Sequence, residues 1–458
     1  MKLQIINPAN GEVLRQVQHD TSETISLKLA RARAAQPGWA ARPLAERLEI
    51  LRRFKDIVAA RKAELAAVTT SEVGKPISQS NNEINALNGR IEFFLEHTAR
   101  AVSEDKVWDD AASRTREAIA YEPLGVVANV SAWNYPYFVG SNVFVPALAT
   151  GNTVLYKPSE FATLTGLELS RALHEAGVPE DVFVPIVGDG QVGAALVDAH
   201  VSGIFFTGSY ATGVKIARAA AGRMVPVQLE LGGKDPVYVA DDVDIDSAAA
   251  GTADGAFYNT GQSCCAVERI YVHEKIYDAF VARFVQEVKG FKVGDPTDPN
   301  TYIGPLTREA QLAVLEAQVA DARAKGGEVL TGGSRIAKPG FWFEPTVVAR
   351  ANREMLLMRE ESFGPIIGIE AVSSDEQALE KMNDTDYGLT AAVYTHDEAR
   401  AAKLLRGVNA GSAYWNCCDR VSPRLPWSGR GHSGIGLTLS EHGIRVFTRP
   451  KAWHLRRP

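Results

Sequence analysis

Two adjacent cysteines are the first candidates for chemistry in this sequence. Cys264 and Cys265 lie in the polar, glycine-containing segment NTGQSCCAVER, residues 259–269, just before the apolar run RIYVH. A structural thiol usually lies inside an apolar run, so a thiol at its polar entrance is a candidate nucleophile. A free thiol has a pKa of about 8.5 and is only slightly ionised at neutral pH, so a reactive cysteine here needs local activation. The alternative is an inert, small apolar side chain.

A single glutamate stands in the otherwise apolar run VQLELGG. Burial of Glu230 in a strand would raise the pKa of its carboxyl towards neutrality. A carboxylate with such a pKa is suited to act as a general base on water or on a thiol. The alternative is a structural glutamate that pairs with a cation elsewhere in the chain.

Two glycine-containing segments follow strand-like runs and could bind phosphate groups. In FFTGSYATGVKIA, residues 205–217, Gly208 and Ser209 precede a helix that contains Gly213. Free N–H groups at a helix N-terminus bind anions, although Ser209 could equally be an ordinary N-cap. GDGQVG, which begins at Gly188, matches the dinucleotide-binding pattern, but the acidic residue expected about 20 residues later is absent. We therefore interpret GDGQVG as a turn.

Lys157 and Glu160 close another strand-like run, LYKPSE. Ligands of open α/β sheets bind beyond the carboxyl ends of the strands, so this ammonium and carboxylate could hold the hydroxyls of a ribose. For one such segment taken alone, a solvated charged loop is the simpler interpretation.

The composition excludes several classes of partner. The chain has 458 residues and a net charge of −6, so it has no basic excess for nucleic acid or an anionic membrane surface. No apolar run approaches the roughly 18 residues that a membrane span needs, and the N-terminus shows no apolar signal segment. The cysteines form two adjacent pairs, Cys264/Cys265 and Cys417/Cys418, which is neither a disulfide framework nor the spacing of a zinc site. We expect a cytoplasmic protein without a metal.

The predicted secondary structure changes along the chain from helices to alternating strands and helices. Residues 20–100 carry apolar residues three or four apart, which predicts amphipathic helices, and residues 101–121 form a charged, irregular excursion. From Pro123 onwards, short strand-like runs alternate with helical stretches, which is typical of βαβ units and a parallel sheet. A second alternating set follows, so the pattern predicts two α/β domains with a boundary near residues 231–235.

Seven short strings occur together and in order along the chain. They are AWNYP (132–136), KPSE (157–160), FTGS (206–209), LELGGKD (229–235), NTGQSCC (259–265), EESFGP (360–365) and NDTDYGL (383–389). With this combination the chain resembles the aldehyde dehydrogenase superfamily of the NAD(P)-dependent, hydrolytic type. The resemblance extends over nearly the whole sequence, from NPANGEV at 7–13 to Lys451.

The resemblance implies an α/β fold of three parts: a Rossmann-like cofactor domain, an α/β catalytic domain and a small β oligomerisation element. We expect residues 1–100 and 122–230 in the cofactor-binding domain and residues 231–420 in the catalytic domain. Residues 101–121 and 437–458 would form the oligomerisation element. Members of this family are usually homodimers or homotetramers.

The resemblance also implies roles for individual residues. The family's nucleophile maps onto Cys264 and its general base onto Glu230, while Cys265 falls on a variable neighbour in the aldehyde tunnel. Asn134 resembles the family's oxyanion donor, which would act with the backbone N–H of Cys264; without the resemblance it would be interpreted as a turn residue. The thiolate adds to the aldehyde carbonyl, hydride leaves for the cofactor, and the resulting thioester is hydrolysed to the acid.

The expected cofactor is NAD, with NADP possible. Glu160 would repel a 2′-phosphate, whereas Lys157 and Ser159 could bind one. The expected cofactor-binding residues are Lys157, Glu160, Gly188, Gly208, Ser209, Gly213, Leu231, Glu361 and Phe363.

Several positions depart from the family pattern. Many members carry a Trp-Lys pair where this chain has Asn142 and Val143, and a glutamate where it has Thr438. The lysine and the glutamate belong to one proton-relay network in some members, so this chain lacks the whole unit. Asn142 should also make the tunnel wall wider and more polar. The unusual SGRG at 428–431 makes the path of the substrate loop, residues 416–427, hard to predict.

Two other functions remain open from the sequence. One is a CoA-acylating dehydrogenase, which passes the thioester to CoA, and Glu230 argues against it. The other is a non-catalytic binding protein on the same scaffold, against which the set of Cys264, Glu230 and Asn134 argues.

The sequence does not identify the aldehyde. Arg420, in WNCCDRVSPRLPW, falls in the loop that closes the substrate tunnel and could bind the carboxylate of a semialdehyde. The preferred interpretation is a surface arginine that pairs with Asp419 or Glu441.

Overall fold

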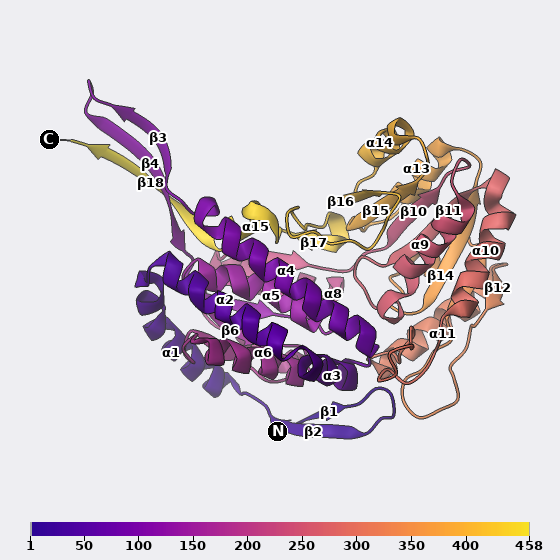
Figure 1. The fold of residues 1–458 in the computed structure, drawn as a ribbon, viewed down its shortest axis with the longest axis horizontal. Coiled ribbons are helices and arrows are strands. Elements are labelled where there is room, and N and C mark those ends of the chain that lie inside the picture. The colour runs from indigo at the N-terminus through magenta and orange to yellow at the C-terminus, as the bar shows by residue number, and fades with distance from the viewer. Residues whose placement is uncertain (1, 458) are drawn as a thin grey trace.

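A computed structural model describes residues 2–457 and contains two large sheets flanked by helices (Figure 1). The chain opens with an antiparallel hairpin, β1 (Lys2–Ile6) and β2 (Val13–Gln18). The four helices that follow are α1 (Ser22–Ala41), α2 (Leu44–Ala60), α3 (Lys62–Val73) and α4 (Ile77–Ala101). The helices expected for residues 20–100 are confirmed. None of the helices in residues 2–457 is long and apolar enough to cross a membrane.

The first large sheet has six strands in the order β17-β9-β8-β5-β6-β7. Its strands are β5 (Val126–Val130), β6 (Thr153–Lys157), β7 (Phe183–Pro185), β8 (Gly203–Thr207), β9 (Val227–Glu230) and β17 (Gly434–Ile435). The five strands from β5 to β9 are parallel, and β17 pairs antiparallel with β9. The parallel sheet expected after Pro123 is confirmed. The short strand β17 was not expected. It brings the C-terminal segment next to Glu230, at the end of β9.

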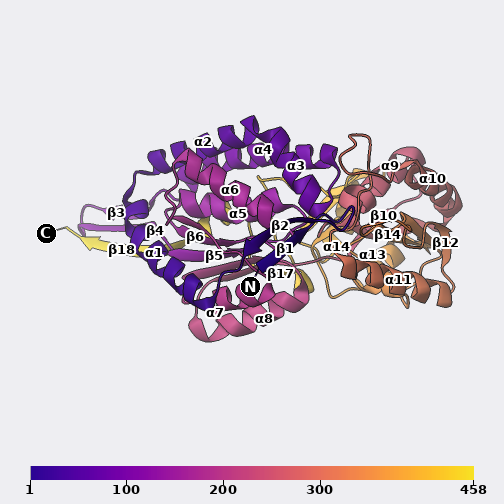
Figure 2. The ribbon, with the colours of Figure 1, turned by 90° about the horizontal axis from the view of Figure 1, so that it is seen from below.

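Helices cover both faces of this sheet (Figure 2). They are α5 (Pro136–Ala149), α6 (Thr163–Ala176), α7 (Gly190–Asp198) and α8 (Tyr210–Ala220). Successive strand residues point to opposite faces, so Val127 packs with α2, α4, α5 and α6, whereas Val126 and Ala128 pack with α1, α7 and α8. Both faces are therefore buried, which explains the almost uninterrupted apolar runs of these strands.

The second large sheet has seven strands in the order β12-β13-β14-β11-β10-β15-β16, and only β12 runs antiparallel. Its strands are β10 (Asp235–Val239), β11 (Val267–His273), β12 (Glu328–Thr331), β13 (Thr346–Ala349), β14 (Ile366–Val372), β15 (Thr390–Tyr394) and β16 (Ser412–Trp415). Two helices pack on one face, α9 (Ile245–Phe257) and α10 (Tyr277–Gly290). Four pack on the other, α11 (Glu309–Ala324), α12 (Leu356–Arg359), α13 (Asp375–Asn383) and α14 (Glu398–Gly407).

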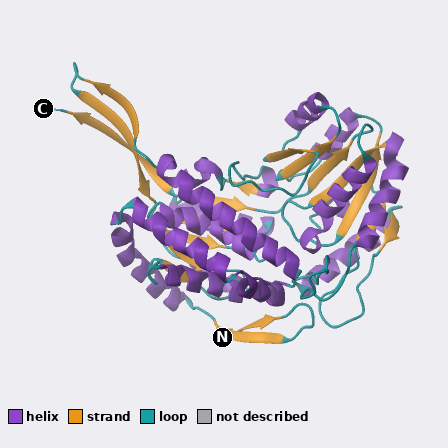
Figure 3. Cartoon of the chain, viewed as in Figure 1, coloured by secondary structure: helices purple, strands orange, loops and turns teal. Residues whose placement is uncertain are grey.

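A three-stranded antiparallel sheet extends from the body of the molecule (Figure 3). It contains β3 (Asp105–Asp110), β4 (Thr115–Pro123) and β18 (Thr448–Arg456), and α15 (Ser440–Arg445) precedes its last strand. The excursion expected at residues 101–121 is therefore a regular pair of strands. The sequence showed only irregular charge there because β3 and β18 are mostly exposed and β4, between them, is mostly half-buried, so no strand has a fully buried face. The division of the chain into domains stays a prediction.

Candidate active site

The candidate nucleophile and base lie on one cavity of about 580 Å³. Cys264, Cys265 and Glu230 all line it, together with residues of α4 and α5 and of the loop that follows Cys418. Glu230 ends β9 in the first sheet, and Cys264 precedes β11 in the second. The cavity therefore forms where the two sheets meet. Asn134 is buried beside Tyr135, which lines the cavity, and the Asn134 side chain makes no hydrogen bond within residues 2–457.

A strained turn positions the cysteines. The short 3₁₀ segment Tyr258–Gly261 holds Asn259 and Thr260 at φ values of 55° and 59°. Such left-handed values are unfavourable for residues with a side chain, so the surroundings must hold them in place. The backbone N–H of Asn259 donates to Gln79 at 2.9 Å, and its side-chain amide donates to the carbonyl of Asn134 at 3.0 Å. Asn259 thus ties the loop of the cysteines to the loop of Asn134.

The two cysteines have different surroundings. Cys265 is only 4% exposed and donates from its sulfur to Asp419 Oδ1 at 2.9 Å. The contact with the Cys264 thiol, burial and the nearby Asp419 carboxylate together raise the pKa of Cys265 well above its usual range. Cys264 is half-buried on the cavity. A thiolate is therefore disfavoured at Cys265, and the geometry favours Cys264 as the nucleophile.

Asp419 was missed as a site residue by the sequence analysis, which treated it only as a partner for Arg420. It lines the cavity at a φ of 49°, and burial raises the pKa of its carboxyl to about 6. Arg420 forms an ion pair with neither Asp419 nor Glu441: its Nη1 donates to the backbone carbonyl of Asp419 at 3.2 Å, and Glu441 contacts His97 and Arg100.

Glu230 is buried and held by three neutral donors. Its Oε1 accepts from Gln228 Nε2 at 3.0 Å and from the hydroxyl of Thr438, and Oε2 accepts from Thr207 Oγ1 at 3.5 Å. Burial raises the pKa of Glu230, while these donors oppose the shift. Thr438, one of the positions that depart from the family pattern, thus contacts Glu230 directly. Val143, another of them, is buried in the apolar core.

A buried ion pair supports the loop that carries Asn134. Lys75 pairs with Glu83, and its ammonium lies 3.8 Å from the centre of the Tyr135 ring. Glu83 Oε1 accepts from the backbone N–H groups of Tyr137 at 2.8 Å and of Phe138 at 3.2 Å. The carboxylate thus satisfies the otherwise unpaired N–H of Tyr137 at the start of α5, while the N–H of Phe138 also donates to the carbonyl of Tyr135.

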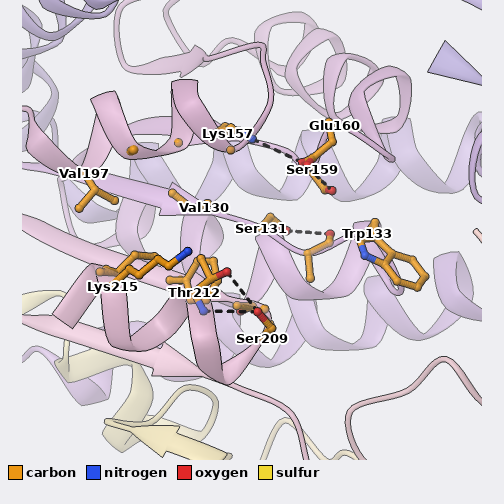
Figure 4. Close-up of a pocket in the computed structure, with 18 of the residues that line it drawn as sticks. Val130, Ser131, Trp133, Lys157, Ser159, Glu160, Val197, Ser209, Thr212 and Lys215 are labelled. Atoms are coloured by element: carbon orange, nitrogen blue, oxygen red, sulfur yellow. Dashed lines mark hydrogen bonds and ion pairs between the residues drawn. The ribbon is translucent and has the colours of Figure 1, made fainter. Parts of the chain in front are cut away.

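A second cavity, of about 720 Å³, lies at the carboxyl ends of the strands in the first sheet (Figure 4). Lys157 and Glu160 lie on one side of it, and Ser209 lies at the start of α8 on the other. Gly208 also lines it. The ammonium of Lys157 is buried and 3.9 Å from the carboxylate of Glu160, and Ser209 accepts a hydrogen bond from Thr212 N–H at 3.4 Å.

The other two glycines predicted to bind the cofactor pack closely against neighbouring side chains. Gly188 and Gly213 do not line this cavity. A Cβ on Gly188 would lie 2.3 Å from the side chain of Val192, and one on Gly213 would lie 2.7 Å from that of Leu231. These glycines therefore permit close packing, and Leu231 lies buried beneath α8.

The segment GDGQVG, interpreted as a turn, both caps α7 and lines the cavity of about 720 Å³. Asp189 accepts hydrogen bonds at the start of α7, as expected for turn chemistry. Gly190 and Gly193 also line the cavity of about 720 Å³, and a Cβ on Gly193 would lie 3.5 Å from the side chain of Lys157. The interpretation as a turn alone was therefore incomplete. Two cations on this cavity, Lys215 and Arg308, were also missed because neither lies in a recognisable motif.

Glu361 and Phe363 lie on a loop of the second sheet. Glu361 Oε1 accepts from the N–H of Gly233 at 2.9 Å, and burial raises the pKa of its carboxyl to about 8. Phe363 has a φ of 47°, and its ring centre lies 5.5 Å from that of Trp133, which lines the cavity of about 720 Å³. The contact with Trp133 places Phe363 at the edge of this cavity, and Glu361 lies two residues earlier on the same loop.

A buried ion pair that the sequence analysis missed holds this loop. Glu268 pairs with Lys234 at 2.6 Å and accepts hydrogen bonds from the backbone N–H groups of Ser362 and Phe363. Within residues 2–457, no group of three or more His, Cys, Asp or Glu side chains could hold a metal ion.

Residues 1–453 match the aldehyde dehydrogenase family over nearly the entire chain. The chain belongs to this family. It is 37% identical to the peroxisomal aminoaldehyde dehydrogenase 1 of Malus domestica, over 97% of this chain and 90% of the relative. It is also 37% identical to a betaine aldehyde dehydrogenase of Cereibacter sphaeroides, over 98% of this chain and 92% of the relative.

Solved structures agree with this membership. A putative aldehyde dehydrogenase from Burkholderia cenocepacia superposes with a TM-score of 0.96 at 34% identity, covering 100% of this chain and 94% of the other. Lactaldehyde dehydrogenase from Escherichia coli also gives 0.96, at 32% identity, covering 100% of this chain and 96% of the other. The aldehyde dehydrogenase fold and the function expected from the sequence are confirmed: the chain is an oxidoreductase that oxidises an aldehyde with NAD or NADP.

The cavity of about 720 Å³ fits a dinucleotide of this kind. Ser209 and the N-terminus of α8 lie at one wall, and the free N–H groups of a helix N-terminus are suited to bind an anion. Lys157, Lys215 and Arg308 add positive charge, which suits a pyrophosphate.

Proposed function

We propose that the chain oxidises its aldehyde to the free carboxylic acid through a thioester on Cys264, with Glu230 as the general base. The observation that carries this proposal is the shared cavity, which holds an accessible thiol and a buried carboxylate of raised pKa. When bound, NAD or NADP supplies the hydride acceptor. Lys157, Glu160, Gly208 and Ser209 would hold it, and Glu361 and Phe363 would close its nicotinamide end.

The first half of the reaction belongs to Cys264. Its sulfur forms a bond to the carbonyl carbon of the aldehyde, and the carbonyl oxygen becomes an oxyanion. The free amide of Asn134 and the backbone N–H of Cys264 would stabilise this charge; removing one such donor usually slows a reaction by about 10²–10³-fold. Loss of hydride from the same carbon restores the carbonyl and leaves a thioester on Cys264.

The second half belongs to Glu230. Its carboxylate takes a proton from water, and the oxygen of this water bonds to the thioester carbon. The bond from carbon to sulfur breaks, so the acid leaves and Cys264 returns as a thiolate. The raised pKa of Glu230 makes it a stronger base than an ordinary carboxylate while it remains able to ionise near neutral pH.

The test of this proposal is an assay with and without CoA. Formation of reduced nicotinamide from a short neutral aldehyde is followed by absorbance, and the product is identified by mass spectrometry. We expect free acid at the same rate whether or not CoA is present. Strict dependence on CoA, with an acyl-CoA product, would contradict the hydrolytic step.

We also propose that the protein forms a homodimer or homotetramer in the cytoplasm. The projecting three-stranded sheet carries exposed apolar side chains, and a protein surface seldom exposes such a group without a partner. They are Val107, Trp108, Trp453 and Leu455. Light scattering that gives the mass of a monomer at micromolar concentration would contradict the oligomer. The four free cysteines agree with a reducing compartment.

The natural aldehyde is a separate question. The names of the relatives refer to aminoaldehydes and betaine aldehyde, which are cationic compounds. In this chain, a cationic aldehyde would enter a cavity that contains the buried guanidinium of Arg90. This charge argues against a cationic aldehyde as the substrate of this chain.

A further inference from the structure

A buried arginine without an ionic partner lines the same cavity as Cys264. Arg90, on α4, is 6% exposed. Its Nη1 donates to Asn142 Oδ1 at 2.9 Å, and its guanidinium lies 3.8 Å from the centre of the Phe138 ring. No carboxylate within residues 2–457 comes within 4.0 Å of its nitrogen atoms, and its other N–H groups have no acceptor there. Burial lowers the pKa of Arg90 to about 10, so the group still carries its charge at neutral pH.

The carboxylates around Arg90 are engaged elsewhere. Glu83 is held by Lys75 and by the N–H groups at the start of α5. Glu230 is held by Thr438 and other neutral donors, and Asp419 accepts from Cys265. Taking an ion out of water without a counter-ion is costly in free energy. Arg90 thus interacts with Glu83 and Glu230 only at a distance, and no carboxylate of the described chain contacts its buried guanidinium.

The departure from the family pattern at Asn142 explains how this charge fits. Many members carry a tryptophan at this position, whereas here a small amide accepts a hydrogen bond from Arg90. Phe138, one helical turn earlier on α5, supports the face of the guanidinium. These two contacts hold the planar fork in place, and a pre-organised guanidinium is suited to bind a carboxylate through two hydrogen bonds.

We propose that Arg90 is a specificity-determining residue that binds a carboxylate carried by the aldehyde, so that the substrate class is a short oxo acid. This inference rests on the proposed oxidation at Cys264. Arg420 lines the same cavity, but its side chain is 66% exposed and lies 4.0 Å from the carboxylate of Asp254, so we expect it to contribute little to binding. Cationic aldehydes would be disfavoured, since they would place like charges together in a site of low polarity.

The first test compares oxo acids with neutral aldehydes of equal length. Glyoxylate, succinic semialdehyde and glutaric semialdehyde are measured beside acetaldehyde, butyraldehyde and valeraldehyde. For at least one length, we expect kcat/KM for the acid to exceed that for the neutral aldehyde by about tenfold or more, the scale of hydrogen bonds to a charged group. Equal values at every length would overturn the inference while leaving the proposed oxidation intact.

The second test uses Arg90→Met and Arg90→Lys. We expect the ratio of kcat/KM for the preferred acid to that for its neutral counterpart to fall about 10- to 100-fold in Arg90→Met, chiefly through KM. The same ratio should fall less in Arg90→Lys, because lysine keeps the charge but lacks the planar guanidinium fork. Arg420→Met serves as the matched control at the cavity opening, with a change in this ratio below about fivefold. An equal loss on acid and neutral aldehyde, with a shifted pH profile, would show that Arg90 acts on the thiol instead.

A third measurement remains informative if the variants fail to fold. In the wild-type protein, succinate should slow alkylation of Cys264 by iodoacetamide, whereas butyramide at the same concentration should not. Absence of protection at tens of millimolar succinate would contradict a carboxylate site beside Cys264. If the wild-type protein oxidises no aldehyde at all, the proposed oxidation fails, and protection by succinate still reports on the site.

Discussion

The two cavities of this protein differ in how they relate to the family pattern. The cavity of about 720 Å³ is built from segments that match family strings, including KPSE and FTGS. The cavity of about 580 Å³ combines the matching Cys264 and Glu230 with the non-matching Asn142 and the altered loop after Cys418. The proposed chemistry thus rests on residues that match family strings, whereas the proposed choice of aldehyde rests on residues that lie outside these strings.

The largest effect should separate the two cysteines. Cys264→Ser should lower kcat by a factor of at least about 10⁴, because a hydroxyl is too weakly acidic to form the adduct at neutral pH. Cys265→Ser should keep at least about a third of the activity, since a serine can still donate to Asp419. Steady-state rates are measured on variants with unchanged thermal melting. Equal loss in both variants would assign the chemistry to the pair instead of to Cys264.

A moderate effect should be the preference of the enzyme for NAD over NADP. We expect kcat/KM for NAD to exceed that for NADP by about tenfold, because the carboxylate of Glu160 would lie near the added 2′-phosphate. Lys157 and Lys215 oppose this preference, since both are cations on the same cavity. Glu160→Gln should narrow the difference between the two cofactors. An equal or higher kcat/KM for NADP in the wild-type protein would reverse the assignment.

The smallest effect should come from Arg420. Its side chain is 66% exposed, and its nearest carboxylate is that of Asp254 at 4.0 Å. Exposed ion pairs contribute under about 1 kcal/mol, so Arg420→Ala should change kcat/KM less than about fivefold on both succinic semialdehyde and butyraldehyde. A loss of kcat/KM above tenfold on the semialdehyde alone would show that Arg420, and not Arg90, binds the carboxylate.

Much of the fold was predictable because local patterns and tertiary packing agree. The apolar stripe of α2 and the alternation of strands and helices after Pro123 both follow from which faces are buried. The strand β17 was not predictable, because two residues, Gly434 and Ile435, carry no strand pattern. It pairs with β9 through contacts between distant parts of the chain.

The candidate site was predictable where a residue type stood out against its neighbours. Cys264 at a polar entrance and Glu230 in an apolar run are such cases. Arg90 and Asp419 could not be found in this way, because charged residues on a helix or a loop usually face solvent. Only the packing of α4 against α5 brings Arg90 into the cavity.

The most direct measurement for the central claim is capture of the thioester in Glu230→Gln. We expect a burst of reduced cofactor near one equivalent per site, followed by turnover slower by about 10²–10⁴-fold, the usual contribution of a general base. In the wild-type protein the rate of hydrolysis should rise with pH as Glu230 loses its proton, over a range displaced upwards by its raised pKa, and Glu230→Gln should lack this rise.

Mass spectrometry of the quenched Glu230→Gln protein then locates the acyl group. The proposed mechanism predicts an acyl mass on Cys264 and an unmodified Cys265. An acyl group on Cys265, or the absence of a burst in a folded protein, would contradict the proposed roles of Cys264 as nucleophile and Glu230 as the base for hydrolysis.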